Sequence, residues 1–90
     1  MRRAAFILAT THRRRLLDLC LSRLDAQEVP DGWDYECIVS GTSEDFGRAV
    51  IRKHTRARWA ESPDEMIGHK LRACVHGTDA ELLIWVGDDD

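Results

Sequence analysis

The sequence predicts a doubly wound α/β fold with three layers, in which a mainly parallel four-stranded sheet lies between helices. Three observations predict this class. Apolar runs suited to strands alternate with stretches of helical periodicity, in the order strand, helix, strand, helix, strand, helix, strand. The first run, residues 4–9, is apolar throughout, as in a parallel strand that is covered on both faces. The chain has 90 residues, which is the size of one domain, 1–90.

The first half of the chain contains two predicted strands and the helix between them. Four leucines and a cysteine recur on one helical stripe between residues 16 and 24, and the charged residues lie largely off that stripe. The turn signal Pro30-Asp31-Gly32 separates this helix from the next apolar run, residues 35–39. We therefore expect strands at 4–9 and 35–39, joined by a helical crossover.

The second half repeats the pattern with clearer helix-start signals. Ser43 is a suitable N-cap for a second helix, with the acids Glu44 and Asp45 in its first turn and Phe46, Ala49 and Val50 on its apolar face. Residues 58–61 are expected to form a short third strand. Ser62-Pro63-Asp64-Glu65 matches an S-x-x-E capping box with proline at the first helical position, which predicts a third helix from there to Gly77. The apolar face of that helix is expected to consist of Ile67, Leu71, Cys74 and Val75. The fourth strand is residues 82–86.

Composition excludes two classes of protein. No apolar run is long enough to span a bilayer, so we expect no membrane span. A formal net charge of −3 and the lack of spaced aromatic residues argue against nucleic-acid binding, even though Arg13, Arg14 and Arg15 form a basic cluster. The cysteines are three in number and far apart, which indicates buried thiols in a reducing cytoplasm.

Three carboxylates, Asp88, Asp89 and Asp90, follow the fourth predicted strand after Gly87. Clustered carboxylates at the carboxyl edge of an α/β sheet supply the hard oxygen ligands that Mg²⁺ and Mn²⁺ prefer. If the extended pattern persists, Asp88 and Asp90 point to the same side, with Asp90 as the direct ligand and Asp88 directed toward a ribose or a metal-bound water. The alternative interpretation is a solvated tail at the chain end.

Four segments, with the leucine-rich helix between the first two, carry a resemblance to a known family: residues 6–13, 38–43, 67–70 and 83–90. In this order they resemble the N-terminal half of a family 2-type glycosyltransferase with the GT-A fold. The resemblance implies a Rossmann-like three-layer half-domain with strand order 3-2-1-4, so that the first and fourth strands are neighbours. It also implies a nucleotide-diphosphate sugar as donor, Mn²⁺ or Mg²⁺ as cofactor, and a D-x-D motif that holds the metal on the diphosphate.

Site residues follow from the resemblance position by position. Asp88 and Asp90 are the implied metal ligands. The implied nucleotide-sugar contacts come from the four segments and are Thr10, Thr11, His12, Arg13, Ser40, Thr42, Gly68, Lys70, Asp88 and Asp89. Of these, Arg13 and Lys70 are expected to offer charge to the diphosphate, and Ser40 and Thr42 to flank the base or ribose. Lys70 has an alternative interpretation as a surface lysine whose stem covers apolar surface. Gly68 either marks a helix that begins after the capping box or a close approach of the backbone to a ligand.

Two departures from the family pattern limit what is implied. Ser40-Gly41 stands where many members have an aspartate pair, which leaves the identity of the base open. The acceptor-binding half and the catalytic base of the family lie beyond the D-x-D strand, so we expect no catalytic residue in this chain, no turnover by the chain alone and an unknown acceptor. Two alternatives stay open: a small non-catalytic α/β interaction module, phage-encoded or regulatory, and a nucleotidyltransferase-like fragment.

Overall fold

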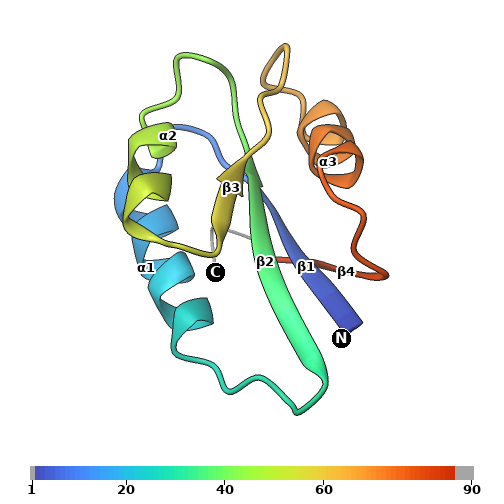
Figure 1. Cartoon of the computed structure of the whole chain (residues 1–90). Coiled ribbons are helices and arrows are strands. Elements are labelled where there is room, and N and C mark those ends of the chain that lie inside the picture. Colours follow the sequence, from blue (N-terminus) through green and yellow to red (C-terminus); the bar gives the residue numbers. More distant parts are fainter. Residues whose placement is uncertain (1, 87–90) are drawn as a thin grey trace.

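The computed structural model describes residues 2–86, and it has the predicted alternation of strands and helices (Figure 1). The elements in chain order are β1 (Arg2–Ala9), α1 (Arg14–Asp25), β2 (Trp33–Ser40), α2 (Gly47–Val50), the 3₁₀ turn η1 (Ile51–Lys53), β3 (Ala57–Trp59), α3 (Ile67–His76) and β4 (Leu82–Trp85). None of the helices within this range has the length and apolar character that a bilayer crossing requires.

All strand pairs in the sheet are parallel, and the strand order is β3-β2-β1-β4. This confirms the expected order 3-2-1-4. The chain moves outward from β1 through β2 to β3 and then returns to the other side of β1, where Ile7 pairs with Trp85. The direction of strand addition therefore reverses at β1. At such a switch point the loops after neighbouring strands separate, and open α/β sheets bind their ligands there.

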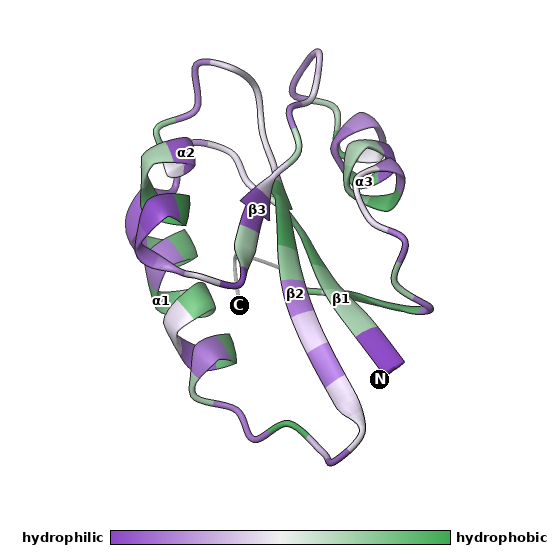
Figure 2. Ribbon diagram, in the orientation of Figure 1, coloured by the Kyte–Doolittle hydropathy of each residue, from purple (hydrophilic) through white to green (hydrophobic). Residues whose placement is uncertain are grey.

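Helices cover both faces of the sheet, as the three-layer prediction requires. Residues of β1 alternate between two cores: Ala4 and Leu8 belong to the cluster under α1, and Ala5 and Ile7 pack with Cys74 of α3. In Figure 2, β1 is hydrophilic at its N-terminal end and hydrophobic over the rest of its length. The hydrophobic run is expected for a strand that is covered on both faces. Burial of Cys74 raises the pKa of its thiol to about 11, so this cysteine is an unreactive core residue.

Two predicted helix starts are wrong. The third helix begins at Ile67 and not at the Ser62 capping box. The backbone N–H of Ser62 instead donates to the carbonyl of Gly41 at 2.8 Å, which continues the chain beyond β3 alongside β2. The carboxylate of Asp64 then accepts the N–H of Met66 and ends the turn before the helix. The second helix begins at Gly47 with Phe46, and not Ser43, as its N-cap residue. Oδ1 of Asp45, just before this cap, accepts the N–H of Gly47 at 2.7 Å.

The predicted apolar face of α3 is also wrong in part. Ile67 and Val75 are exposed, whereas Lys70 and Cys74, four residues apart, point into the structure. The third strand covers Ala57–Trp59, one residue earlier at its start and two earlier at its end than the predicted 58–61. β4 lies at the edge of the sheet, and all four of its side chains are 36 to 62 % exposed. This strand therefore leaves apolar surface uncovered on both faces.

A buried histidine joins η1 to α1. His54 lies between two carboxylates of α1, with Nδ1 at 2.6 Å from Asp25 and Nε2 at 2.8 Å from Asp18. Ionised carboxylates only accept hydrogen bonds, so this geometry favours the protonated imidazole, in which both ring nitrogens donate. Burial alone would lower the pKa of His54, but the hydrogen bonds to Asp25 and Asp18 outweigh it and the pKa is raised. The hydrogen bond from His54 correspondingly lowers the pKa of Asp18.

This clamp predicts how stability depends on pH. Because the pKa of His54 is raised on folding, its contribution is complete below its unfolded pKa of about 6.5 and is lost as the pH rises through the folded value. The lowered pKa of Asp18 has the opposite consequence, a loss as the pH falls below about 4. We expect urea unfolding between pH 6 and 8 to show a decreasing free energy of unfolding, with a slope of at most about 1.4 kcal/mol per pH unit from this one proton. His54→Gln should remove the slope, and His76→Gln, which changes an exposed histidine at the end of α3, should keep it. An unchanged slope in His54→Gln would contradict the assignment.

Candidate functional site

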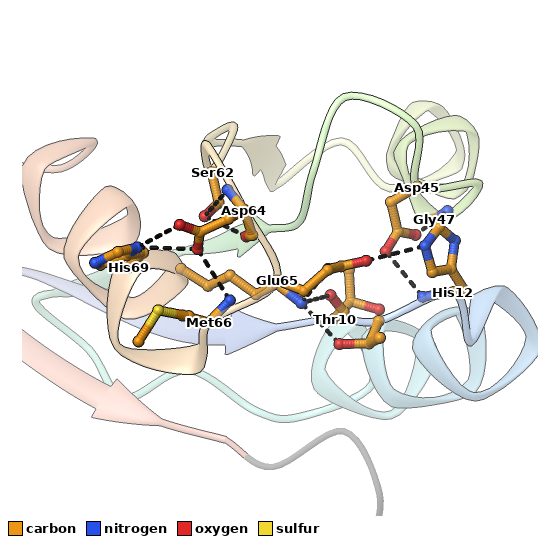
Figure 3. Close-up of polar contacts among 11 residues, drawn as sticks. Thr10, His12, Asp45, Gly47, Ser62, Asp64, Glu65, Met66 and His69 are labelled. Carbon is orange, nitrogen blue, oxygen red and sulfur yellow. Dashed lines mark hydrogen bonds and ion pairs between the residues drawn. The ribbon is translucent and has the colours of Figure 1, made fainter.

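The loops that follow β1, β2 and β3 meet at the carboxyl edge of the sheet (Figure 3). They meet there because parallel strands all end at one edge. The backbone N–H of Thr10 donates to the carbonyl of Ser40 at 2.9 Å, so the first two loops leave the sheet together. On the other side of β1, the N–H of Val86 donates to the carbonyl of Ile7 at 3.0 Å. The last described residues of β4 thus lie beside the end of β1, at the same edge.

Lys70 is the most deeply buried charged side chain at this edge, with 1 % of its surface exposed. Its ammonium group donates to the carbonyl of Thr10 at 2.8 Å and to Oγ1 of Thr11 at 2.7 Å, and it pairs with Oε1 of Glu65 at 2.7 Å. An ammonium group has three hydrogens, and these three acceptors match them. Lys70 is therefore neither a solvated surface lysine nor a side chain that extends freely toward a ligand. It connects the loop after β1 to the segment before α3.

One carboxylate oxygen of Glu65 pairs with this ammonium group, and the other oxygen makes a second contact. The hydrogen bond from Lys70 is the main reason that the pKa of Glu65 lies below its usual value, and the contact with His12 acts in the same direction against partial desolvation. Oε2 of Glu65 lies 3.0 Å from Nε2 of His12. The carboxylate is thus ionised at neutral pH and lies between the Lys70 ammonium and the His12 imidazole, which come from different parts of the chain.

His12 turns the chain after β1 and faces two acids. Its φ of 51° places it in the left-handed region, where residues other than glycine are uncommon. The backbone N–H of His12 donates to Oδ2 of Asp45 at 2.8 Å, while the imidazole reaches Glu65 and lies edge-on to the ring of Phe46. Asp45 is 3 % exposed, and its other oxygen accepts the N–H of Gly47. A carboxylate with two backbone donors fixes the relative position of the loops after β1 and β2.

Three buried polar atoms near the ends of β1, β2 and β3 have no hydrogen-bond partner within the described residues. They are Oγ1 of Thr10, Oγ of Ser40 and Nε1 of Trp59. A buried group left unpaired costs about 1 to 3 kcal/mol, so such atoms mark places for a bound water or a polar ligand group. Gly41 lies among them, and a Cβ there would come within 2.8 Å of the Trp59 ring. The glycine is therefore required by close packing at the end of β2.

The structure brings together some of the residues that the sequence singled out and separates others. Thr10, Thr11, His12 and Lys70 belong to one hydrogen-bonded network. Ser40 is buried beneath the edge, Thr42 is half-buried in the next loop, and Arg13 is exposed at the N-cap of α1. Gly68 lies in the first turn of α3 with open space around its Cα, so the later helix start accounts for it without a packing constraint. Asp88, Asp89 and Asp90 lie outside the described residues.

Two residues of the network were not predicted as site residues from the sequence. Asp45 was expected only as an acid in the first turn of a helix, and Glu65 only as part of a capping box. Their contacts to His12 span 33 and 53 residues, so periodicity could not reveal them. The available signal was topological: both acids follow a parallel strand, and every such strand ends at this edge.

Replacement of Lys70 by methionine tests the network. Lys70→Met keeps the bulk of the side chain but leaves the Thr10 carbonyl without its donor. We therefore expect urea denaturation to give a free energy of unfolding that is lower by about 1 to 3 kcal/mol. Lys53→Met removes the other lysine, which is exposed and forms only a 4.0 Å contact with Asp18, and should change stability by less than about 0.5 kcal/mol. Equal stability of the two variants would contradict the role assigned to Lys70.

Comparisons of the chain with protein-family models, with curated proteins and with solved structures gave no significant match. The resemblance to glycosyltransferases therefore depends on the order of the sequence motifs alone. The structure itself establishes a parallel sheet of order β3-β2-β1-β4 and a polar network at its carboxyl edge.

Proposed function

We propose that this chain is the nucleotide-sugar-binding half of a metal-dependent glycosyltransferase, which moves a sugar from a nucleotide-diphosphate donor to an unknown acceptor. One observation carries the proposal: β1 lies between β2 and β4 in an all-parallel sheet. The loop of residues 10–13 therefore follows the strand at the switch point. The neighbouring strand β4 is the one that the sequence continues into Gly87-Asp88-Asp89-Asp90. This is the arrangement that a nucleotide site needs in an open α/β sheet.

The loop after β1 is suited to contact a diphosphate. Thr11, His12 and Arg13 are exposed, and Thr10 anchors the loop through the N–H bond to Ser40 and the carbonyl bond to Lys70. Arg13 at the start of α1 offers a guanidinium, which pairs with phosphate oxygens in a fixed geometry. In this proposal Lys70 supports binding mainly by holding the loop, because its three hydrogens already have acceptors. Ser40 and Thr42 at the end of β2 flank the base or ribose.

The terminal carboxylates supply the remaining part of the site. Asp88 and Asp90 offer hard oxygen donors, which fit Mn²⁺ or Mg²⁺ better than softer metals. A divalent cation on the diphosphate neutralises the charge that develops on the leaving group. Asp89 completes the nucleotide-sugar contacts. We assign neither a catalytic base nor an acceptor contact to this chain. Buried thiols such as Cys37 and Cys74 fit a reducing cytoplasm.

One observation favours a second candidate, a small non-catalytic interaction module. Leu82, Leu83, Ile84 and Trp85 form an exposed apolar edge strand, and such a surface is typical of a contact with another protein element. The same surface is also expected in a half-domain whose partner half packs against β4. The two candidates differ in nucleotide binding, which only the first requires.

Calorimetric titration of UDP, GDP and their sugars into the full chain, with and without Mn²⁺, tests the proposal. We expect one of the nucleotides to bind in a Mn²⁺-dependent manner, and Asp90→Asn to weaken that binding at least about tenfold through loss of a direct metal ligand. Asp31→Asn, which removes one negative charge from the turn before β2, is the matched control and should bind as the original chain does. Absence of nucleotide binding by the folded chain, or equal binding by Asp90→Asn, would remove the proposed mechanism and leave the interaction module.

A further inference from the structure

Within the described residues, three side chains of types that bind metals meet at the carboxyl edge of the sheet. One ligand atom from each of His12, Asp45 and Glu65 lies within 4.8 Å of the other two. The three residues come from the loops after β1, β2 and β3, so the parallel topology brings them together from distant parts of the sequence. Figure 3 shows the three side chains turned toward one another above the end of β1.

The two carboxylates of this cluster are already held by groups outside it. Oε1 of Glu65 is bound by the buried ammonium of Lys70 at 2.7 Å, and Oδ1 of Asp45 by the N–H of Gly47 at 2.7 Å. Metal ligands in proteins are oriented by outer hydrogen bonds of this kind, which restrict their rotamers before the ion arrives. In this respect the cluster differs from a group of freely solvated surface acids.

The donor set determines which ion fits. One imidazole nitrogen with two carboxylate oxygens suits a divalent transition metal, with ligand bonds of about 2.0 to 2.2 Å. Such bonds place ligand atoms about 3 to 4 Å apart, so the cluster has to contract by less than about 2 Å to close around an ion. The His12 and Glu65 side chains, each 44 % exposed, can make that movement, while the buried Asp45 stays in place.

We propose that His12, Asp45 and Glu65 bind one divalent transition-metal ion of the zinc class. Three protein ligands with two of them exposed leave at least one coordination position open to solvent, as in sites that bind a further ligand and unlike closed structural sites. None of the three ligands is one of the terminal aspartates on which the proposed function depends. The site does not require the nucleotide sugar, so it can hold where the proposed function fails.

Zn²⁺ titration of the full chain carrying Asp88→Asn and Asp90→Asn tests the site without the two terminal carboxylates that we propose as metal ligands. We expect binding of one ion per chain, with Co²⁺ giving the absorption spectrum of a nitrogen- and oxygen-ligated ion. His12→Ala and Glu65→Gln in this background should each weaken binding at least about tenfold, since they remove direct ligands. His69→Ala is the matched control, because His69 is also bound to a carboxylate, Asp64 at 2.8 Å, but lies outside the cluster.

Circular dichroism on each variant separates loss of a metal ligand from loss of the fold. Glu65→Gln is used in place of Asp45→Asn, because Asp45→Asn would disturb the buried turn. Three results would overturn the proposal. The first is the absence of stoichiometric binding up to about 1 mM Zn²⁺, because a dissociation constant above this concentration is too weak for a built site. The second is binding that the original chain keeps after His12→Ala but that is absent from the chain carrying Asp88→Asn and Asp90→Asn. The third is equal weakening by His69→Ala and His12→Ala, which indicates general affinity of surface histidines.

Discussion

A single buried ammonium group holds the carboxyl edge of this sheet together. Placing a charge in a protein interior is costly unless it is fully paired, and Lys70 meets that condition with a carbonyl, a hydroxyl and a carboxylate. Each of its partners is thereby fixed: Thr10 and Thr11 in the loop after β1, and Glu65 before α3. The position of Glu65 in turn determines which atom His12 meets, and the backbone of His12 is held by Asp45 from the loop after β2. The three loops therefore form one connected unit.

This connected edge is the common basis of both proposals. For nucleotide binding, it gives a rigid loop whose exposed groups can contact a diphosphate at the switch point between β1 and β4. For metal binding, it gives three ligands whose orientation is set from outside. A second contact stabilises the same part of the fold. His54 is bound by Asp18 and Asp25 and so holds η1 against α1, which supports the loop that carries Asp45. Within residues 2–86, this organisation leaves the apolar side chains of strand β4 exposed.

The sequence predicts the elements of this fold better than it predicts their contacts. The change of hydrophobic period identified β1, α1, β2 and β4, because each has a long periodic or apolar stretch. The strand order followed only from a resemblance, since periodicity carries no information on which strands are neighbours. The start of α3 was wrong because an S-x-x-E pattern has no way to indicate that Ser62 already bonds to Gly41. Lys70 was expected at the surface or on a phosphate, since a lysine beside an apolar stripe gives no sign of three acceptors up to 60 residues away. Asp45 and Glu65 were not predicted as site residues for the same reason.

The chain contains two lysines, Lys53 and Lys70, which makes the central claim directly measurable. In ¹H–¹⁵N correlation spectra tuned to ammonium groups, exposed lysines exchange their protons with water too quickly to be seen near neutral pH, whereas a buried and fully hydrogen-bonded ammonium exchanges slowly. The account predicts one observable ammonium signal, which shows nuclear Overhauser contacts to Thr11 and disappears in the chain that lacks Lys70. Two equally fast-exchanging lysines, or a slow signal that belongs to Lys53, would show that Lys70 does not hold the edge and would contradict the account.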